Sequence, residues 1–349
     1  MTVSNRVNTV VSRTAQLTVG RDLVPPQIDT ISGAATKVIV RFAEPVEATS
    51  ADTAAFYTIS GGVKVQAAAL DQTDMQTVTL TTSAMSFGTV YTLSVNGVKD
   101  RFGNSANGQA PFRTTILIDG DFQDWAGIAP ATTETQDTPE GLEFKEIYVA
   151  NDDDYLYVRF NFYADVGQLP VDNYFHVYSD TDNDPTTGFG AGGIGSEMMI
   201  ENGNGYQQKN GQFNEGVVQN LDFAIGPQAH SAEFECRISR KTVYDSDGLP
   251  VYTGDTIALV LQLISSTWAV IDTAPQAGGL VYTFAKLAPL NPGPLHVRLS
   301  GGTIEMTWTG PGVLEAKDNL TNGTWVQVSS TSPFSVSPTG QQRYFRLKL

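Results

Sequence analysis

The sequence predicts an all-β protein made of tandem β-sandwich domains. Hydrophobic residues make up 41% of the 349 residues, and Val, Thr, Ile, Tyr and Phe recur in short alternating runs. Alternation of this kind is typical of strands, and no convincing stretch keeps the period of a helix. A chain of this length exceeds what one core ordinarily serves, so we expect several consecutive domains.

The charge of the chain is uneven and sets a central region apart. The whole chain has 21 basic and 37 acidic residues, a net charge of −16. Residues 115–285 hold 26 acidic and 6 basic residues, a net of −20, whereas the remainder holds 11 acidic and 15 basic residues, a net of +4. This excess disfavours nucleic acid and anionic membranes as partners. It also opposes compaction unless solvent or bound cations offset it.

Other classes are excluded by what the sequence lacks. The single cysteine, Cys236, has no partner for an internal disulfide, and three histidines are too few for a His-rich zinc site. No apolar run reaches the roughly 18 residues of a membrane helix, so membrane insertion is not expected. The start, MTVSNRVNTVVSR, lacks the apolar core of a signal peptide, and any export signal is expected to lie elsewhere.

Residues 1–23 are predicted to be fragmentary strands. Small apolar and Thr side chains alternate at Val7, Thr9, Val11, Ala15, Leu17 and Val19, which predicts a hairpin. An isolated ribbon is marginal in water. The segment resembles the last two strands of a bacterial Ig-like domain. We expect it to belong to such a domain truncated upstream or to add to a sheet edge elsewhere, including that of a neighbouring subunit.

Residues 24–114 show strand-like runs at the regular spacing of a β-sandwich. The runs are KVIVRFAEPV, FYTISG, VKVQAAALD, TVTLTT and VYTLSVNGV, with a closing segment near PFRTT. KVIVRFAEPVEATSADTAAFYTIS and TVTLTTSAMSFGTVYTLSVNGVKDRFGN resemble the bacterial Ig-like domain of S-layer and secreted multidomain proteins. That resemblance implies a spacer without chemistry of its own.

Residues 115–287 are predicted to form a larger, acidic sandwich. The runs IDGDFQDW, NDDDYLYVRF and DTDNDPTTGF followed by GGIGSE resemble the carbohydrate-binding module family 9-like sandwiches, relatives of the DOMON fold. The resemblance implies a glycan-binding module with structural calcium. Residues 293–349, after the linker LNPGPLH, resemble the small C-terminal β-domain of secreted proteins from environmental bacteria, on MTWTGPGVLEAKDNLTNGTWVQV and RYFRLKL.

Alternate carboxylates in SDTDNDPTTG predict a calcium site. Asp180, Asp182 and Asp184 follow a strand, and Ca²⁺ takes six to eight oxygen ligands in irregular geometry. The loop is not an EF-hand, because Pro185 stands where that loop needs Gly. The alternative is a solvated turn, which Asp and Asn also favour.

Two further acidic groups are weaker metal candidates. Asp119 and Asp121, with Asp124, form one, and Asn151 to Asp154 form the other. Both also suit ordinary turns, at Asp119-Gly120 and in the connection before YLYVRF. Trp125, between the two groups, is expected to anchor the core.

Aromatic side chains are the candidates for sugar binding, because a pyranose stacks on flat rings. The candidates are Trp268, Tyr174, Tyr178, Phe189 and Tyr206. The alternative places these rings in the core, except that Trp268 is the best candidate for an exposed platform. The family's first tryptophan is replaced here by Pro170 and Val171, and its arginine is missing from SEMMIENG, so fold and calcium transfer better than sugar binding does.

These observations favour a non-catalytic accessory region, extracellular or on the bacterial cell surface, whose partner is a polysaccharide or surface glycan. The first alternative is a structural subunit of a surface layer or filament, whose partners are copies of itself. A lesser alternative is an unrecognised polysaccharide-active enzyme. It is weak because GxSxG, P-loop and HExxH motifs are absent and 37 carboxylates form pairs by chance. Haem on His176 with Met198 or Met199 is weaker still.

Overall fold

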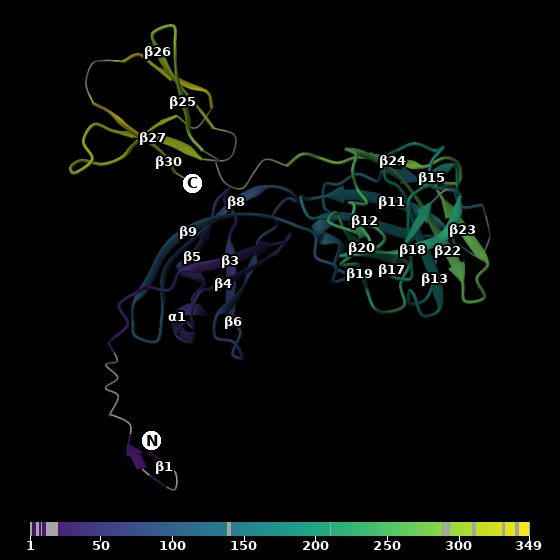
Figure 1. Ribbon diagram of the computed structural model, residues 1–349, viewed down its shortest axis with the longest axis horizontal. Helices are drawn as coiled ribbons and strands as arrows, with labels where there is room; N and C mark the ends of the chain where they lie inside the picture. Colours follow the sequence, from purple (N-terminus) through teal and green to yellow (C-terminus); the bar gives the residue numbers. More distant parts are fainter. Residues whose placement is uncertain are drawn as a thin grey trace.

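The computed structural model describes residues 2–4, 7, 9–11, 20–137, 141–209, 211–287, 290, 294–308, 312–329, 332–338 and 342–348. Its regular elements are nearly all antiparallel strands, which confirms the all-β class and the tandem sandwich architecture. The short helical elements are α1 (Ala48–Ala51), η1 (Ala54–Phe56) and η2 (Phe122–Trp125). Figure 1 shows the strands gathered into successive β units along the chain.

The N-terminal hairpin differs in place from the one predicted. Strands β1 (Thr2–Ser4) and β2 (Thr9–Val11) form a two-stranded sheet, and within the described residues they pair with no other strand. Val7 lies in the connection and is exposed. Alternation indicates extended chain but not where the chain turns. The residues predicted as the first strand of the hairpin, from Val7 to Val11, therefore include the second strand of the structure, β2. Ala15, Leu17 and Val19 lie outside the described residues.

The next unit packs two sheets over one core. One sheet has the order β3 (Ile28–Gly33), β4 (Lys37–Phe42), β7 (Thr77–Thr82), β6 (Val65–Leu70). The other has the order β5 (Tyr57–Ile59), β8 (Val90–Lys99), β9 (Ser105–Arg113). Alternate residues of β4, from Val38 to Phe42, are fully buried against Leu93 of the facing sheet. Each such buried side chain contributes roughly 1.5 to 3 kcal/mol.

The central unit is a larger sandwich. Its five-stranded sheet has the order β10 (Thr132–Thr133), β11 (Phe144–Asn151), β12 (Tyr155–Phe162), β20 (Glu233–Ser239), β19 (Ala224–Gly226). Its eight-stranded sheet has the order β21 (Val243–Tyr244), β18 (Gln212–Gln219), β17 (Asn204–Lys209), β16 (Met198–Glu201), β13 (Asn173–Asp180), β22 (Thr256–Ser265), β23 (Val270–Ala274), with β24 (Leu280–Thr283) also on β22. The hairpin β14 (Phe189–Ala191) and β15 (Ile194–Ser196) lies beside it.

Strand β13 decides which residues of the central sandwich can form a site. Phe175 and Val177 point into the core between the two sheets. Because side chains alternate along a strand, Tyr174, His176 and Tyr178 point to the opposite face. The strand then ends at Asp180, which begins the acidic loop.

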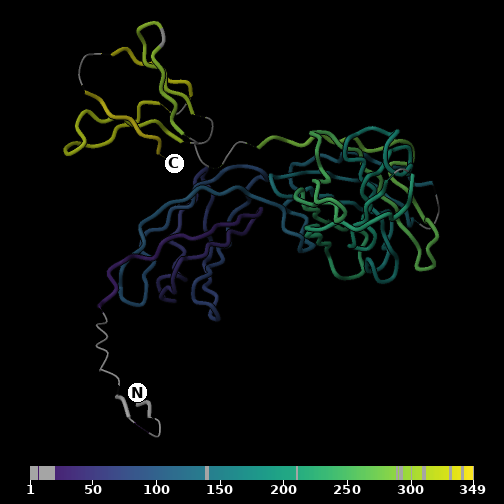
Figure 2. Tube along the Cα trace, viewed as in Figure 1, coloured from purple at the N-terminus to yellow at the C-terminus, as the bar shows by residue number. Residues whose placement is uncertain are grey.

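The last unit is a small sandwich of two three-stranded sheets. Their orders are β25 (His296–Ser300), β26 (Thr303–Thr307), β29 (Phe334–Val336) and β28 (Val326–Ser329), β27 (Val313–Lys317), β30 (Tyr344–Lys348). Its core is formed by Met306, Trp308 and Leu314. Figure 2 traces the chain through the units in order, from purple at the N-terminus to yellow here.

Candidate functional site

Three carboxylates converge at the end of β13. Asp180 ends the strand, Asp182 lies in the following loop, and Glu197 joins β15 to β16. One oxygen from each lies within 4.8 Å of the others. Backbone and side-chain donors hold Glu197 in place: Thr181 N donates to its Oε2 at 2.8 Å, and Thr187 Oγ1 donates to its Oε1 at 2.7 Å.

This cluster is electrostatically unfavourable without a cation. Burial raises the pKa of Asp180 and of Glu197, and repulsion from Asp182 raises both further. A bound divalent cation favours the ionised forms and offsets that repulsion. Carboxylates on an irregular loop suit Ca²⁺ best among common metals.

Asp184, the third predicted ligand, lies outside this convergent group of carboxylates. Its Oδ1 accepts hydrogen bonds from Thr186 N at 3.0 Å and Thr186 Oγ1 at 2.7 Å, and these bonds lower its pKa. Its backbone N–H donates to Asp180 and Asp182. Glu197 completes the cluster instead. Sequence spacing missed Glu197 because it reaches the loop through strand pairing.

The second acidic group contributes hydrogen bonds and an ion pair at the junction between the first two sandwiches. Asp124 is buried, and its carboxylate accepts hydrogen bonds from Ala35 N at 2.6 Å and Leu117 N at 2.9 Å. Asp119 Oδ2 lies 3.6 Å from Lys37 Nζ. Asp121 accepts from Gln123 N at 3.2 Å and so caps η2. Asp119, Asp121 and Asp124 line one small pocket, but among the described residues they do not form a group whose carboxylate oxygens all lie within 4.8 Å of one another, so a metal there stays a prediction.

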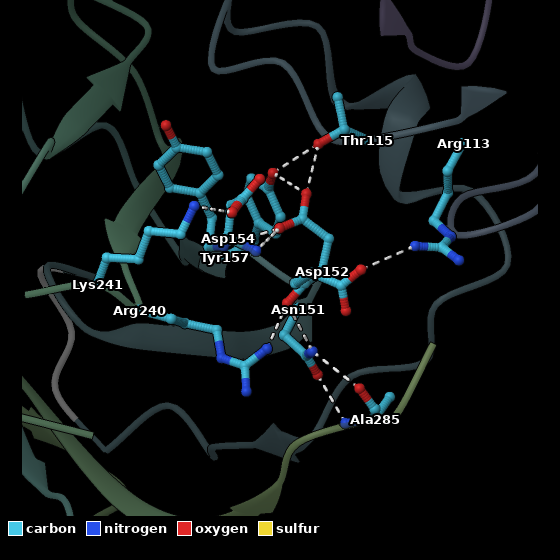
Figure 3. A network of polar contacts seen from close by, with 11 residues as sticks. Arg113, Thr115, Asn151, Asp152, Asp154, Tyr157, Arg240, Lys241 and Ala285 are labelled. Carbon is cyan, nitrogen blue, oxygen red and sulfur yellow. Dashed lines mark hydrogen bonds and ion pairs between the residues drawn. The ribbon is translucent and has the colours of Figure 1, made fainter. Parts of the chain in front are cut away.

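The third acidic group lies at the same junction, which Figure 3 shows from close by. Asp152 Oδ2 accepts hydrogen bonds from Thr115 Oγ1 at 3.0 Å and from Tyr157 OH at 2.7 Å. Arg113, at the end of β9, pairs with Asp153 at 3.2 Å. An apolar contact adds to these bonds, because the ring of Phe87 meets that of Tyr157 edge to face at 6.1 Å.

A buried carboxylate, Glu235, fixes the segment that enters the central sandwich. Glu235 is fully buried on β20. It accepts hydrogen bonds from Trp125 Nε1 and Gly120 N, both at 2.8 Å, and from Asp119 N at 3.1 Å. Burial raises its pKa to about 7. Trp125 is almost fully buried, which confirms it as a core anchor.

Two of the predicted aromatics form an exposed platform. Trp268 is 56% exposed and lies in the turn between β22 and β23, with a left-handed φ of 69°. Its ring centroid lies 4.8 Å from that of half-buried Tyr174 and 6.5 Å from that of His176. The two rings are tilted by 45° to one another, and the exposed indole can stack against the apolar face of a sugar.

Polar groups lie beside this platform on the neighbouring strands. His176 is nearly buried, burial lowers its pKa, and its Nε2 forms no hydrogen bond within the described structure. That atom lies 3.5 Å from Glu201 Oε2, while Gln262 is the register partner of His176 on the other side. Glu201 and Gln262 are half-buried and can exchange hydrogen bonds with hydroxyl groups, whereas His176 Nε2 is closed off from solvent.

The other three predicted aromatics lie in a separate cluster. Tyr178 is buried, and Phe189 and Tyr206 are half-buried, around Met199 and Val260. The structure therefore brings Tyr174 to Trp268 but does not bring Phe189 or Tyr206 there. Met198 and Met199 are fully buried.

Comparison with known proteins assigns one part of the chain. Residues 15–115 match the bacterial Ig-like domain family. This confirms the Ig-like part of the predicted resemblance. The match lies outside the central sandwich, so that sandwich's resemblance to family 9 carbohydrate-binding modules and DOMON domains stays a prediction. No curated protein matches the sequence.

Solved structures align at low similarity. The N-terminal part of the bacterial S-layer protein SbsC aligns with 75% of this chain and 45% of its own, at 11% identity and a TM-score of 0.27. The structure of SbsC domains 1–6 aligns with 86% of this chain and 48% of its own, at 12% identity and a TM-score of 0.26. The structure of the chicken CNTN1 FN1–FN3 domains aligns with 89% of this chain and 87% of its own, at 13% identity and a TM-score of 0.19. The chain thus spans about half the length of these SbsC structures. Its described residues include no helix long and apolar enough to cross a bilayer.

Proposed function

We propose that this chain is a non-catalytic structural segment of a bacterial extracellular or cell-surface protein that associates with copies of itself. In this proposal the Ig-like domain is a spacer, and the central sandwich is held to it at a fixed angle. The match of residues 15–115 to the bacterial Ig-like family supports the spacer role.

The observation that carries this proposal is the junction between the two sandwiches. Domains of one chain ordinarily move relative to one another unless their interface is extensive. Here a buried carboxylate, Asp124, receives N–H groups from both sides of the junction, and Thr115, Arg113 and Phe87 add separate contacts. Such a junction suits a building block that must keep its shape.

Solution scattering of the full chain tests the rigidity. We expect the native chain to keep one relative placement of the first two sandwiches, and Asp124→Ala to broaden the distribution of distances. Asp29→Ala, which removes an exposed carboxylate of β3, is the matched control. Sedimentation velocity over a range of concentrations tests the self-association. A chain that stays monomeric throughout, or whose first two sandwiches move independently in the native form, contradicts the proposal.

Glycan binding by the central sandwich is the second candidate function. It is supported by the contact of exposed Trp268 with Tyr174 beside the half-buried polar side chains of Glu201 and Gln262. The net charge of −20 over residues 115–285 repels acidic polymers, so a neutral polysaccharide is the proposed ligand.

Calorimetric titration with a panel of neutral polysaccharides tests this candidate. We expect Trp268→Ala to abolish binding, because it removes the exposed ring, while Phe102→Ala, which removes an exposed ring of the Ig-like domain, leaves binding unchanged. Absence of binding by the native chain to the whole panel, with calcium present, rejects the candidate. We also propose Ca²⁺ as the ion held by Asp180, Asp182 and Glu197, with a structural role in either function.

A further inference from the structure

The C-terminal sandwich has an open edge at β25. Within the described residues β25 pairs with β26 alone, so no described strand pairs with the backbone N–H and C=O groups of its other side. Val297 is the register partner of Met306, which pairs in turn with Phe334. Residues directly opposite one another in antiparallel strands share a face, so Val297 points to the same side as the buried Met306.

The core-facing side of this edge strand is nevertheless uncovered. Val297 is 61% exposed and Leu299 is 72% exposed, whereas Met306 in the same row is buried. The facing three-stranded sheet therefore leaves these two side chains uncovered. An exposed edge and exposed apolar side chains on one strand are the combination that strand addition satisfies, because an added strand pairs the backbone and lets apolar residues meet.

We propose that β25 is the self-association surface, and that its occupant is the β25 strand of a second copy. This rests on the proposed structural function. Charge favours a second copy here: residues 294–349 hold five basic and three acidic residues, a net of +2, against −20 for residues 115–285. Two copies therefore approach through this domain without the repulsion that separates their central sandwiches.

The charged and apolar side chains of β25 favour one register for the pairing of the two β25 strands. Arg298 is paired with Glu305 at 3.0 Å in its own domain. A two-fold axis at Arg298 would set two guanidinium groups directly opposite, which is destabilising. An axis at Val297 instead sets Val297 against its counterpart and Leu295 against Leu299, so the apolar residues form one stripe. Gly301 and Gly302, both at positive φ, end the strand and limit pairing centred on Leu299.

Cysteine cross-linking in the full chain tests this pairing. The native Cys236 is fully buried, so an introduced cysteine is the reactive one. We expect Val297→Cys to form a disulfide-linked dimer under mild oxidation. Val281→Cys is the matched control, because Val281 is also a strand valine and is 61% exposed. In sedimentation velocity, we expect Val297→Asp to raise the dissociation constant of self-association at least tenfold. Val281→Asp should leave that constant unchanged.

The outcomes separate this surface from the broader function. If the native chain associates but Val297→Asp associates equally well and Val297→Cys does not cross-link, β25 is not the surface and the structural function stands on another interface. If Val297→Cys cross-links selectively and the native chain forms a dimer, both the pairing and the self-association hold, because a two-fold pairing of edge strands closes at two copies. Circular dichroism of both aspartate variants confirms folding.

Discussion

At the scale of single residues, Glu235 links pH to stability. Its pKa rises from the usual 4.5 to about 7 because it is buried. The native state therefore holds a proton that the unfolded chain releases, so Glu235 favours folding at low pH and this contribution is lost as pH rises from about 4.5 to 7. The loss corresponds to roughly 3 kcal/mol.

Denaturant unfolding at a series of pH values, with native and Glu235→Gln chains, measures this. The glutamine cannot ionise, so we expect the variant to lose less stability than the native chain across that window and the two curves to converge or cross. Glu215→Gln, at an exposed position of β18, should follow the native curve. Curves for Glu235→Gln that stay parallel to the native ones would mean that the buried carboxylate does not titrate there.

At the scale of elements, the strands themselves could be predicted, but not which strands meet. Alternation in YFHVYSD located β13 and its two faces, because period two depends on neighbouring residues alone. Glu197 and Glu201 reach β13 only through its pairing with β16, and Gln262 only through β22. Such contacts join residues far apart in sequence. The sequence therefore pointed to Asp180, Asp182, Tyr174 and Trp268, but it did not point to Glu197, Glu201 and Gln262, which strand pairing brings beside them.

The loop from β13 to β14 gives the element-scale prediction. If it binds Ca²⁺ in the native state alone, calcium at about 100 times its dissociation constant stabilises the sandwich by about 2.7 kcal/mol, which corresponds to roughly 5 to 10 °C in midpoint. We expect a chelator to remove this shift in the native chain and in Glu215→Gln. Asp182→Asn should show no shift. Calorimetry with and without chelator decides, and a native midpoint indifferent to chelator removes the calcium proposal.

At the scale of the whole molecule, the net charge of −20 over residues 115–285 sets the response to salt. With 26 acidic and 6 basic residues in this range, repulsive pairs outnumber attractive ones, such as Arg237 with Asp222. The junction adds attractive pairs with basic residues of the Ig-like domain, Lys37 with Asp119 and Arg113 with Asp153. Raising monovalent salt from 0.01 to 0.15 M shortens the screening length from about 30 to about 8 Å. Screening should therefore stabilise the central sandwich.

We expect its calorimetric midpoint to rise with sodium chloride in the native chain and equally in Asp182→Asn, because screening acts on the whole charge distribution rather than on one site. Calcium at matched ionic strength should raise the native midpoint further and leave the variant at the sodium value. This comparison separates diffuse repulsion from a bound ion. A midpoint that falls with sodium chloride would show instead that attractive pairs, including those of the junction, outweigh the repulsion among the carboxylates.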